Sequence, residues 1–251
     1  MPAESPSHGS RSLVVDPADS LASPFDWHDT DGVVGVESTQ TIGNNVWAQL
    51  DLNDTDGNTG QTAEGGASLN FDFPFDPADE PSDYRPAVLT NLFYWNNVIH
   101  DVLYHYGFDE AGGNFQENNY GRGGAESDFV WADAQDGSGT NNANFGTPPD
   151  GSNPRMQMYV WTNANPDRDS DFDNGVIAHE YGHGVSNRLT AGPSNVRCLG
   201  NEEQMGEGWS DYLGLILTME AGDTSTDRRG IGTYVLNQSP TADGIRRHPY
   251  T

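Results

Sequence analysis

Two histidines with a glutamate beside the first form the clearest chemical pattern in the sequence. His179 and His183 are four residues apart in the segment HEYGH, and Glu180 directly follows the first. Residues four apart lie on the same face of a helix, so both imidazoles can reach one metal ion. Zinc lowers the pKa of a bound water to roughly 7, and a carboxylate such as Glu180 can then take up the proton. The pattern therefore predicts one catalytic zinc ion, with Glu180 as the catalytic general base.

A catalytic zinc site needs a third protein ligand and an open coordination position. Glu207, in the segment MGEGWSD, lies far enough beyond His183 for a turn and a second helix to intervene. Asp211 follows four residues later and shares a helix face with Glu207. It can accept the spare N–H of a zinc-binding histidine, a partner that such histidines usually have. We expect His179, His183 and Glu207 as metal ligands and Asp211 as the supporting carboxylate.

The elements that must position these residues follow from apolar periodicity. Apolar residues recur with a helical period from Pro86 to Gly107. Two further helices are expected at about 174–190 and 203–220. Strand-like stretches lie between Gly-, Asn- and Asp-rich loops, at 33–36, 45–50, 128–132 and 156–161.

This order of elements predicts an α+β fold. Residues 1–24 are rich in Ser, Pro, Ala and Asp and are expected to form a flexible lead-in. A β-rich N-terminal lobe with one long helix should span 25–172. A helical zinc-binding part should span 173–251, as an incomplete C-terminal lobe.

The composition limits the classes of molecule that the chain can bind. The 251 residues carry a formal net charge of -27, and 34% of them are hydrophobic, enough to form a core. So acidic a surface, in which all the basic residues are arginine, repels nucleic acid and anionic membranes. It favours a soluble monomer and also suits a salty medium. No apolar run is long enough to span a membrane, and the opening residues lack a signal-peptide core, so a secreted chain would be a mature or trimmed form.

Two groups of loop acids leave calcium (Ca²⁺) binding open. Aspartates alternate over 167–173, but the EF-hand pattern fails because Asn174 stands where its invariant glycine is required. An acidic cluster that favours the dipole of the following helix is the simpler interpretation. The acidic loop 51–58 has the same two interpretations.

Segments spread over about residues 25–251 carry the features of one protein family. They include HEYGHG at 179–184, GEGWSD at 206–211, FDWHDT at 25–30, NNVIHD at 96–101, GNFQ at 113–116, AQDGSG at 134–139, NANF at 142–145, PRM at 154–156 and GIRR at 244–247. Together they resemble the fungalysin family, within the thermolysin-like gluzincin metallopeptidases.

The resemblance implies a secreted, extracellular zinc metalloendopeptidase with a thermolysin-like catalytic domain, which hydrolyses internal bonds of protein or peptide substrates. It implies that Glu180 acts first as general base and then as proton donor. Asn142 and Ala143 are similar to the edge segment that hydrogen-bonds an extended substrate backbone. Arg246 is similar to the arginine that holds the substrate carbonyl beyond the scissile bond.

The C-terminal part departs from the family pattern. Family members continue with a helical lobe that closes the cleft and carries a catalytic histidine, and the context of His248 does not match that histidine. The chain is therefore expected to be truncated at its C-terminus relative to the family. Two alternatives to an active protease stay open: a zinc-binding but catalytically incomplete fragment, and a calcium-binding secreted structural module.

Overall fold

A four-stranded sheet lies at the centre of the computed structural model, which describes residues 3–55, 57 and 60–251. The strands of the protein are β1 (Val46–Leu50), β2 (Val130–Ala134), β3 (Ala143–Gly146), β4 (Arg155–Met158), β5 (Val160–Trp161) and β6 (Arg168–Asp169). The central sheet has the order β1-β2-β4-β3. Its first three strands are parallel, whereas β3 pairs antiparallel with β4 and forms an edge. β5 and β6 form a separate antiparallel pair.

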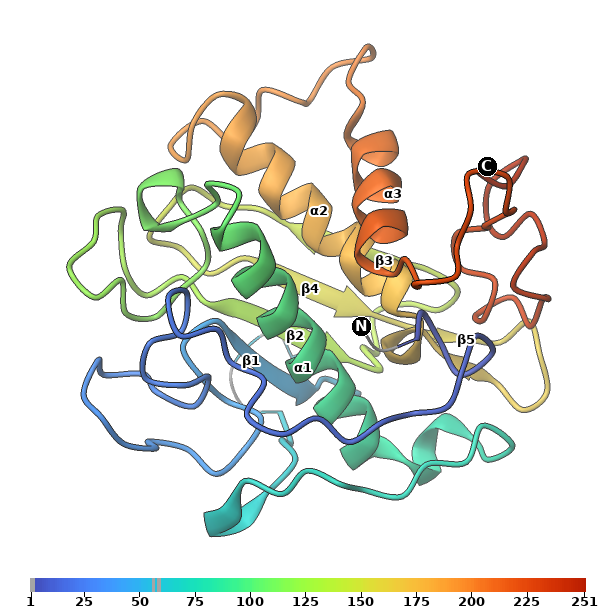
Figure 1. Ribbon diagram of the computed structural model, residues 1–251, viewed down its shortest axis with the longest axis horizontal. Coiled ribbons are helices and arrows are strands. Elements are labelled where there is room, and N and C mark those ends of the chain that lie inside the picture. Colours follow the sequence, from blue (N-terminus) through green and yellow to red (C-terminus); the bar gives the residue numbers. More distant parts are fainter. Residues whose placement is uncertain (1–2, 56, 58–59) are drawn as a thin grey trace.

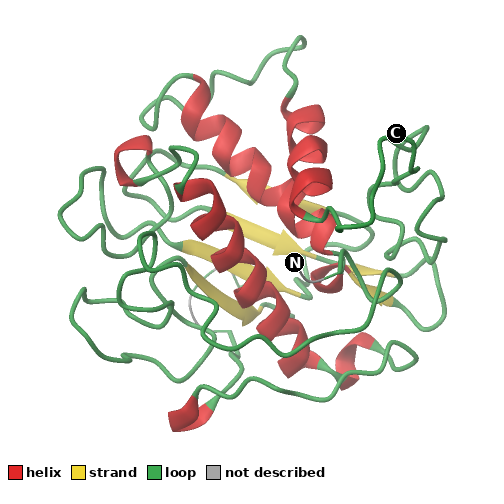
Figure 2. Ribbon diagram, in the orientation of Figure 1, coloured by secondary structure: helices red, strands yellow, loops and turns green. Residues whose placement is uncertain are grey.

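Three α-helices pack on and beside this sheet. They are α1 (Arg85–Tyr104), α2 (Asn174–Thr190) and α3 (Gly206–Leu217). Short 3-10 helices span Gly66–Ser68, Pro81–Asp83, Glu110–Gly112 and Ser170–Phe172. Figure 1 shows α1 lying across the sheet, with α2 and α3 packed against each other beyond it. Long loops connect these elements (Figure 2).

One hydrophobic core joins the sheet to α1 and α2. Trp95 and Ile99 of α1 are fully buried, as are Ala132 of β2 and Met156 of β4. Burying an aliphatic or aromatic side chain of this kind stabilises the fold by about 1.5–3 kcal/mol. Ile177 of α2 belongs to the same core, so the first turns of α2 are held directly on this platform.

The predicted α+β class is confirmed, and the three predicted helices are present with adjusted ends. The helix expected at 203–220 is shorter, Gly206–Leu217. The strand expected at 33–36 is wrong, because Val33 and Val34 are exposed and no strand pairs with them among the described residues. The strand expected at 156–161 is broken at Tyr159, whose carbonyl accepts hydrogen bonds from the hydroxyl (2.6 Å) and the backbone N–H (3.4 Å) of Ser170.

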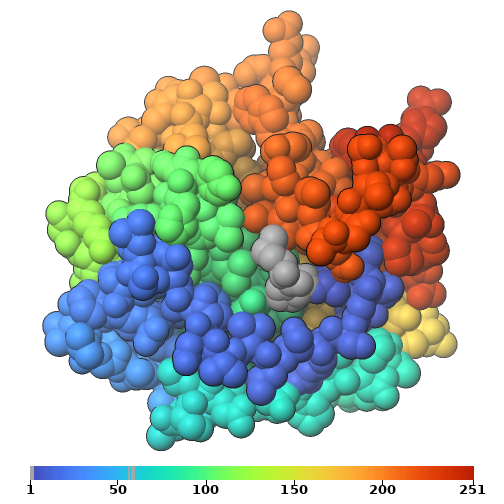
Figure 3. All heavy atoms as spheres, in the orientation of Figure 1, coloured from blue at the N-terminus to red at the C-terminus, as the bar shows by residue number. Residues whose placement is uncertain are grey.

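The N-terminal segment is packed at its beginning against the helical part of the chain. The carbonyl of Glu4 accepts a hydrogen bond from the backbone N–H of Asn174 (2.8 Å). Its carboxylate accepts one from Arg229 Nη2 (2.7 Å). In Figure 3 dark-blue spheres of the N-terminal segment accordingly lie beside the red C-terminal ones.

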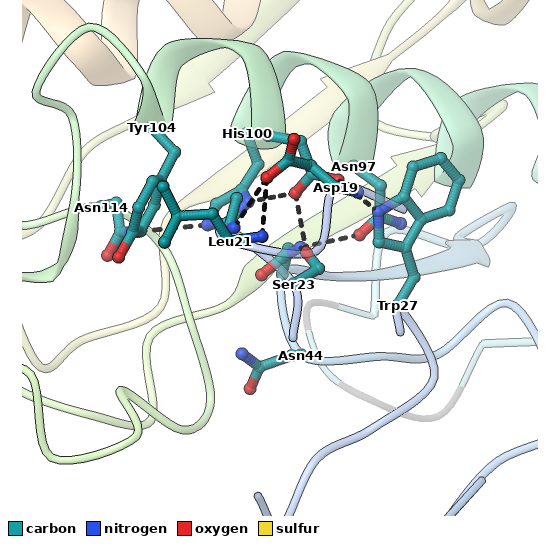
Figure 4. Close-up of polar contacts among 12 residues, drawn as sticks. Asp19, Leu21, Ser23, Trp27, Asn44, Asn97, His100, Tyr104 and Asn114 are labelled. Atoms are coloured by element: carbon teal, nitrogen blue, oxygen red, sulfur yellow. Dashed lines mark hydrogen bonds and ion pairs between the residues drawn. The ribbon is translucent and has the colours of Figure 1, made fainter. Parts of the chain in front are cut away.

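A buried carboxylate on α1 holds the end of the same segment, where Figure 4 shows Ser23 and Trp27 beside this helix. Asp101 accepts hydrogen bonds from the Ser23 hydroxyl (2.7 Å) and from Trp27 Nε1 (2.7 Å). His100 bridges Asp101 and Asn114, as expected for a structural histidine. The proposed division into a lead-in (1–24) and two parts (25–172 and 173–251) stays a prediction.

Within the described residues, every helix is too short or too polar to cross a bilayer.

Candidate metal centre

The helix α2 carries two of the predicted metal ligands. It begins at Asp173, whose side chain accepts a hydrogen bond from the backbone N–H of Val176 and caps the helix. His179 and His183 then lie one turn apart on one face of the helix. His179 is buried and His183 is partly buried, so His183 is the more accessible of the two imidazoles.

Glycines allow α3 to approach the backbone of α2. A Cβ atom at Gly182 would lie 3.0 Å from Cα of Ser210. A Cβ atom at Gly214 would lie 2.9 Å from the carbonyl oxygen of Gly175. Larger residues at Gly182 or Gly214 would push the two helices apart. This close crossing brings Glu207, in the first turn of α3, over the two histidines of α2.

The three predicted ligands converge on one point. Nε2 of His179 and Nε2 of His183 are 3.1 Å apart. The carboxylate oxygens of Glu207 lie 3.4 Å from Nε2 of His179 and 3.5 Å from Nε2 of His183. Ligand atoms about 2.0–2.1 Å from a tetrahedral zinc ion are roughly 3.3–3.4 Å from one another. The donor types and their separations therefore fit a zinc ion, and the exposed Glu207 leaves one side of the site open.

Asp211 fixes the orientation of the first histidine. Its Oδ1 lies 2.8 Å from Nδ1 of His179. A carboxylate only accepts hydrogen bonds, so the imidazole proton resides on Nδ1 and the lone pair of Nε2 points to the metal position. Burial lowers the pKa of His183, and proximity to His179 lowers it further. His183 is thus favoured in the neutral form that a metal requires.

Glu180 lies beside this convergence point with a free carboxylate oxygen. The residue is buried, and its Oε2 has no hydrogen-bond partner among the described residues. Burial raises the pKa of Glu180 to about 7. A buried carboxylate without a partner is costly and is retained where a reaction uses it.

The predicted substrate-binding residues lie at two places. Ala143 begins the edge strand β3, and Asn142 immediately precedes it on the surface. Arg246 lies at the metal centre, where its Nη2 is 3.0 Å from Oε2 of Glu207. Its Nε and Nη2 also donate to Asp211, both at 2.7 Å. Arg246 therefore contacts the zinc-site carboxylates directly, which the sequence did not indicate.

Acidic residues of both loops already interact with other groups of the chain. Asp51 and Asp136 each lie 3.1 Å from Nη2 of Arg155, so an arginine already provides a positive charge beside this group. Asp56 and Asn58 of the predicted calcium loop lie outside the described residues. At the other acidic stretch, Asp173 serves as the cap of α2 by accepting a hydrogen bond from the backbone N–H of Val176.

Sequence reasoning did not identify two structural determinants of the site. The first is the close contact between Gly182 of α2 and Ser210 of α3. The glycines within HEYGHG and GEGWSD are the sequence signal that could have indicated it. The second is Tyr250, whose hydroxyl donates to Oδ2 of Asp211 (2.6 Å). No local sequence pattern links Tyr250 to Asp211, because the two residues meet only through the turns after α3.

Comparisons with known proteins agree with this geometry. The sequence profile of the family described as "Fungalysin metallopeptidase (M36)" matches residues 1–251. The chain is 48% identical over 249 residues to "Extracellular metalloproteinase MEP" of Fusarium vanettenii, which covers 98% of this chain and 38% of the relative. It is 45% identical to "Extracellular metalloproteinase mep" of Aspergillus terreus, with the same coverage. It is 43% identical to "Extracellular metalloproteinase 2" of Trichophyton rubrum, over 98% of this chain and 39% of that protein.

The chain spans about two fifths of the length of these curated relatives. The family profile nevertheless covers all of it, and the residues that could hold the metal lie within the match. The chain therefore belongs to the fungalysin family of metallopeptidases.

Proposed function

We propose that this chain carries the catalytic centre of a secreted zinc endopeptidase that cleaves internal peptide bonds of proteins. One observation supports this most strongly. Nε2 of His179, Nε2 of His183 and the Glu207 carboxylate meet at the spacing of a tetrahedral zinc site, with the buried Glu180 carboxylate beside them. The names of the relatives agree, since each is an extracellular metalloproteinase.

His179, His183 and Glu207 would hold the zinc ion. When bound, zinc acts as a Lewis acid that activates water and polarises the scissile carbonyl. The Glu180 carboxylate would accept a proton from the attacking water and deliver it to the leaving amine nitrogen. Asp211 keeps the proton of His179 on Nδ1 throughout the cycle.

The substrate backbone would bind along the edge strand β3. No strand pairs with its outer edge among the described residues, so its main-chain groups are available to an extended peptide. Asn142 and Ala143 would supply the first of these hydrogen bonds. The terminal Nη1 of Arg246 would approach the substrate carbonyl, since Nε and Nη2 are held by the acidic side chains. Zinc is the cofactor of this proposal, which assigns no role to calcium.

Hydrolysis of unfolded casein by the chain with one equivalent of zinc tests the proposal. Glu180→Gln should lower the turnover by about 10²–10⁴-fold, the range for loss of a general base, while zinc content stays the same. Glu203→Gln, an exposed glutamate before α3, is the matched control and should keep full turnover.

Equal turnover in the wild type and Glu180→Gln would refute the role of Glu180. Zinc binding without turnover in either protein would instead identify the catalytically incomplete fragment.

A further inference from the structure

The segment from Gly244 to Tyr250 is anchored to the rest of the fold at both ends. At its start, the backbone N–H of Ile245 donates to the carbonyl of Ile231 (2.8 Å). At its end, Tyr250 exchanges two backbone hydrogen bonds with Arg229, of 2.8 and 2.9 Å. The path of this segment is therefore fixed by main-chain contacts that do not depend on its side chains.

A glycine is required where this segment begins. Gly244 has φ of 69°, which L side chains rarely adopt, and a Cβ atom there would lie 2.1 Å from the carbonyl oxygen of Ile231. The close approach sets the direction in which the next residues leave. Arg246 and Tyr250 both reach the same carboxylate, that of Asp211.

The anchor at the other end is tied to α3 itself. The Arg229 side chain donates to the carbonyl of Leu215 (2.7 Å) and to the hydroxyl of Thr218 (2.6 Å), at the C-terminal end of α3. Asp211 lies on the same helix. The backbone of Tyr250 and the carboxylate that its hydroxyl contacts are thus held by one helix, so their separation is set by the fold.

Four contacts define the Asp211 carboxylate. Oδ1 is contacted by His179 Nδ1 (2.8 Å) and Arg246 Nη2 (2.7 Å). Oδ2 is contacted by Arg246 Nε (2.7 Å) and by the hydroxyl of Tyr250 (2.6 Å). Two donors on each oxygen restrain rotation of the carboxylate plane. Within the described part of the chain, His179 and Arg246 each also contact Glu207, whereas the Tyr250 hydroxyl donates its hydrogen bond to Asp211.

We propose that Tyr250 is a positioning residue for the metal centre: its hydroxyl holds the plane of the Asp211 carboxylate and, through it, the orientation of His179. The inference rests on the proposed zinc site and adds to it Tyr250, which acts through Asp211 and His179. Burial and the Asp211 carboxylate raise the pKa of Tyr250 to about 12, so the phenol remains a donor over the working pH range. Loss of a residue that supports a metal ligand typically weakens metal affinity about 10–100-fold.

Zinc affinity of the full 251-residue chain, measured by competition with a chromophoric chelator, tests this inference. Tyr250→Phe removes only the hydroxyl and should weaken zinc binding about 10-fold, at the lower end of that range. Tyr212→Phe is the matched control, because Tyr212 lies on α3 with an exposed side chain, and it should bind zinc like the wild type. Melting of the zinc-free proteins should be the same for all three and establishes that the variants are folded.

A double-mutant cycle with Asp211→Asn separates positioning from a general loss of structure. If Tyr250 acts through Asp211, Tyr250→Phe should cost little further affinity once Asp211→Asn is present. The Nδ1 proton of His179, followed by nitrogen-15 NMR in zinc-loaded protein, should broaden or shift in Tyr250→Phe and stay unchanged in Tyr212→Phe.

A zinc affinity of Tyr250→Phe within twofold of the wild type would overturn the role of Tyr250 and leave the zinc site intact. An equal loss of zinc affinity from Tyr250→Phe in the wild type and in Asp211→Asn would do the same. A wild-type chain that binds no zinc would overturn both the site and this inference.

Discussion

At the residue scale, the metal centre could be predicted where its members share one helix. The spacing of His179 and His183 on α2, and of Glu207 and Asp211 on α3, determines which side chains face the same way. The contacts of Arg246 and Tyr250 with Asp211 could not be predicted in this way. They depend on the path of a loop, and no periodic pattern encodes that path.

Asp173 provides a prediction about pH. Burial and the nearby Glu4 raise the pKa of Asp173 to about 7. A carboxyl whose pKa is raised by folding stabilises the protein below the unfolded value of about 3.9, and this contribution is lost as the pH rises towards 7. Asp173→Asn keeps the helix cap but removes the charge. The variant should therefore gain stability over the wild type as the pH rises from 4 to 8, by about 2–4 kcal/mol at the upper end.

Urea denaturation at several pH values measures this difference. Asp79→Asn, at an exposed aspartate, is the control and should track the wild type throughout. A stability difference between Asp173→Asn and the wild type that stays constant from pH 4 to 8 would show that folding does not raise the pKa of Asp173.

At the element scale, the long helices were predictable, whereas isolated short strands were not. The ends of α2 at 174 and 190 agree with the sequence prediction, because Asp173 caps the helix and its apolar face is continuous. The valines at 33–36 are typical of a strand, but a strand also needs a neighbouring strand to pair with. The sequence alone does not reveal that residues 33–36 have no such neighbour among the described residues.

The far end of α2 is held by a fully buried arginine. Arg188 donates to Asp128 (2.9 Å) and to the carbonyl of Gly113 (3.0 Å). Arg188→Met would leave the buried Asp128 without its counterion, so we expect a loss of about 3–5 kcal/mol in the free energy of unfolding. Chemical denaturation measures the loss, with Arg197→Met at an exposed position as the control. A loss no larger than that of the control would mean that Asp128 is neutral in the folded protein.

At the scale of the whole molecule, charge dominates the behaviour expected in solution. A net charge of -27 on 251 residues produces self-repulsion that the folded state must overcome. Raising the salt from 0.1 to 1 M shortens the Debye length from about 10 to about 3 Å and should raise the melting temperature at pH 7. Near the sequence pI of ≈ 4.1 the same change in salt should have little effect. A melting temperature at pH 7 that does not respond to salt would show that self-repulsion contributes little to stability.

X-ray absorption at the zinc edge of the chain loaded with one equivalent tests the central claim most directly. Two imidazole nitrogens at about 2.0–2.1 Å with oxygen ligands completing four-coordination are expected, from His179, His183 and Glu207. His183→Ala should remove one imidazole from the spectrum. An oxygen-only spectrum, unchanged in His183→Ala, would place the metal in the acidic loops and contradict the assignment of this site.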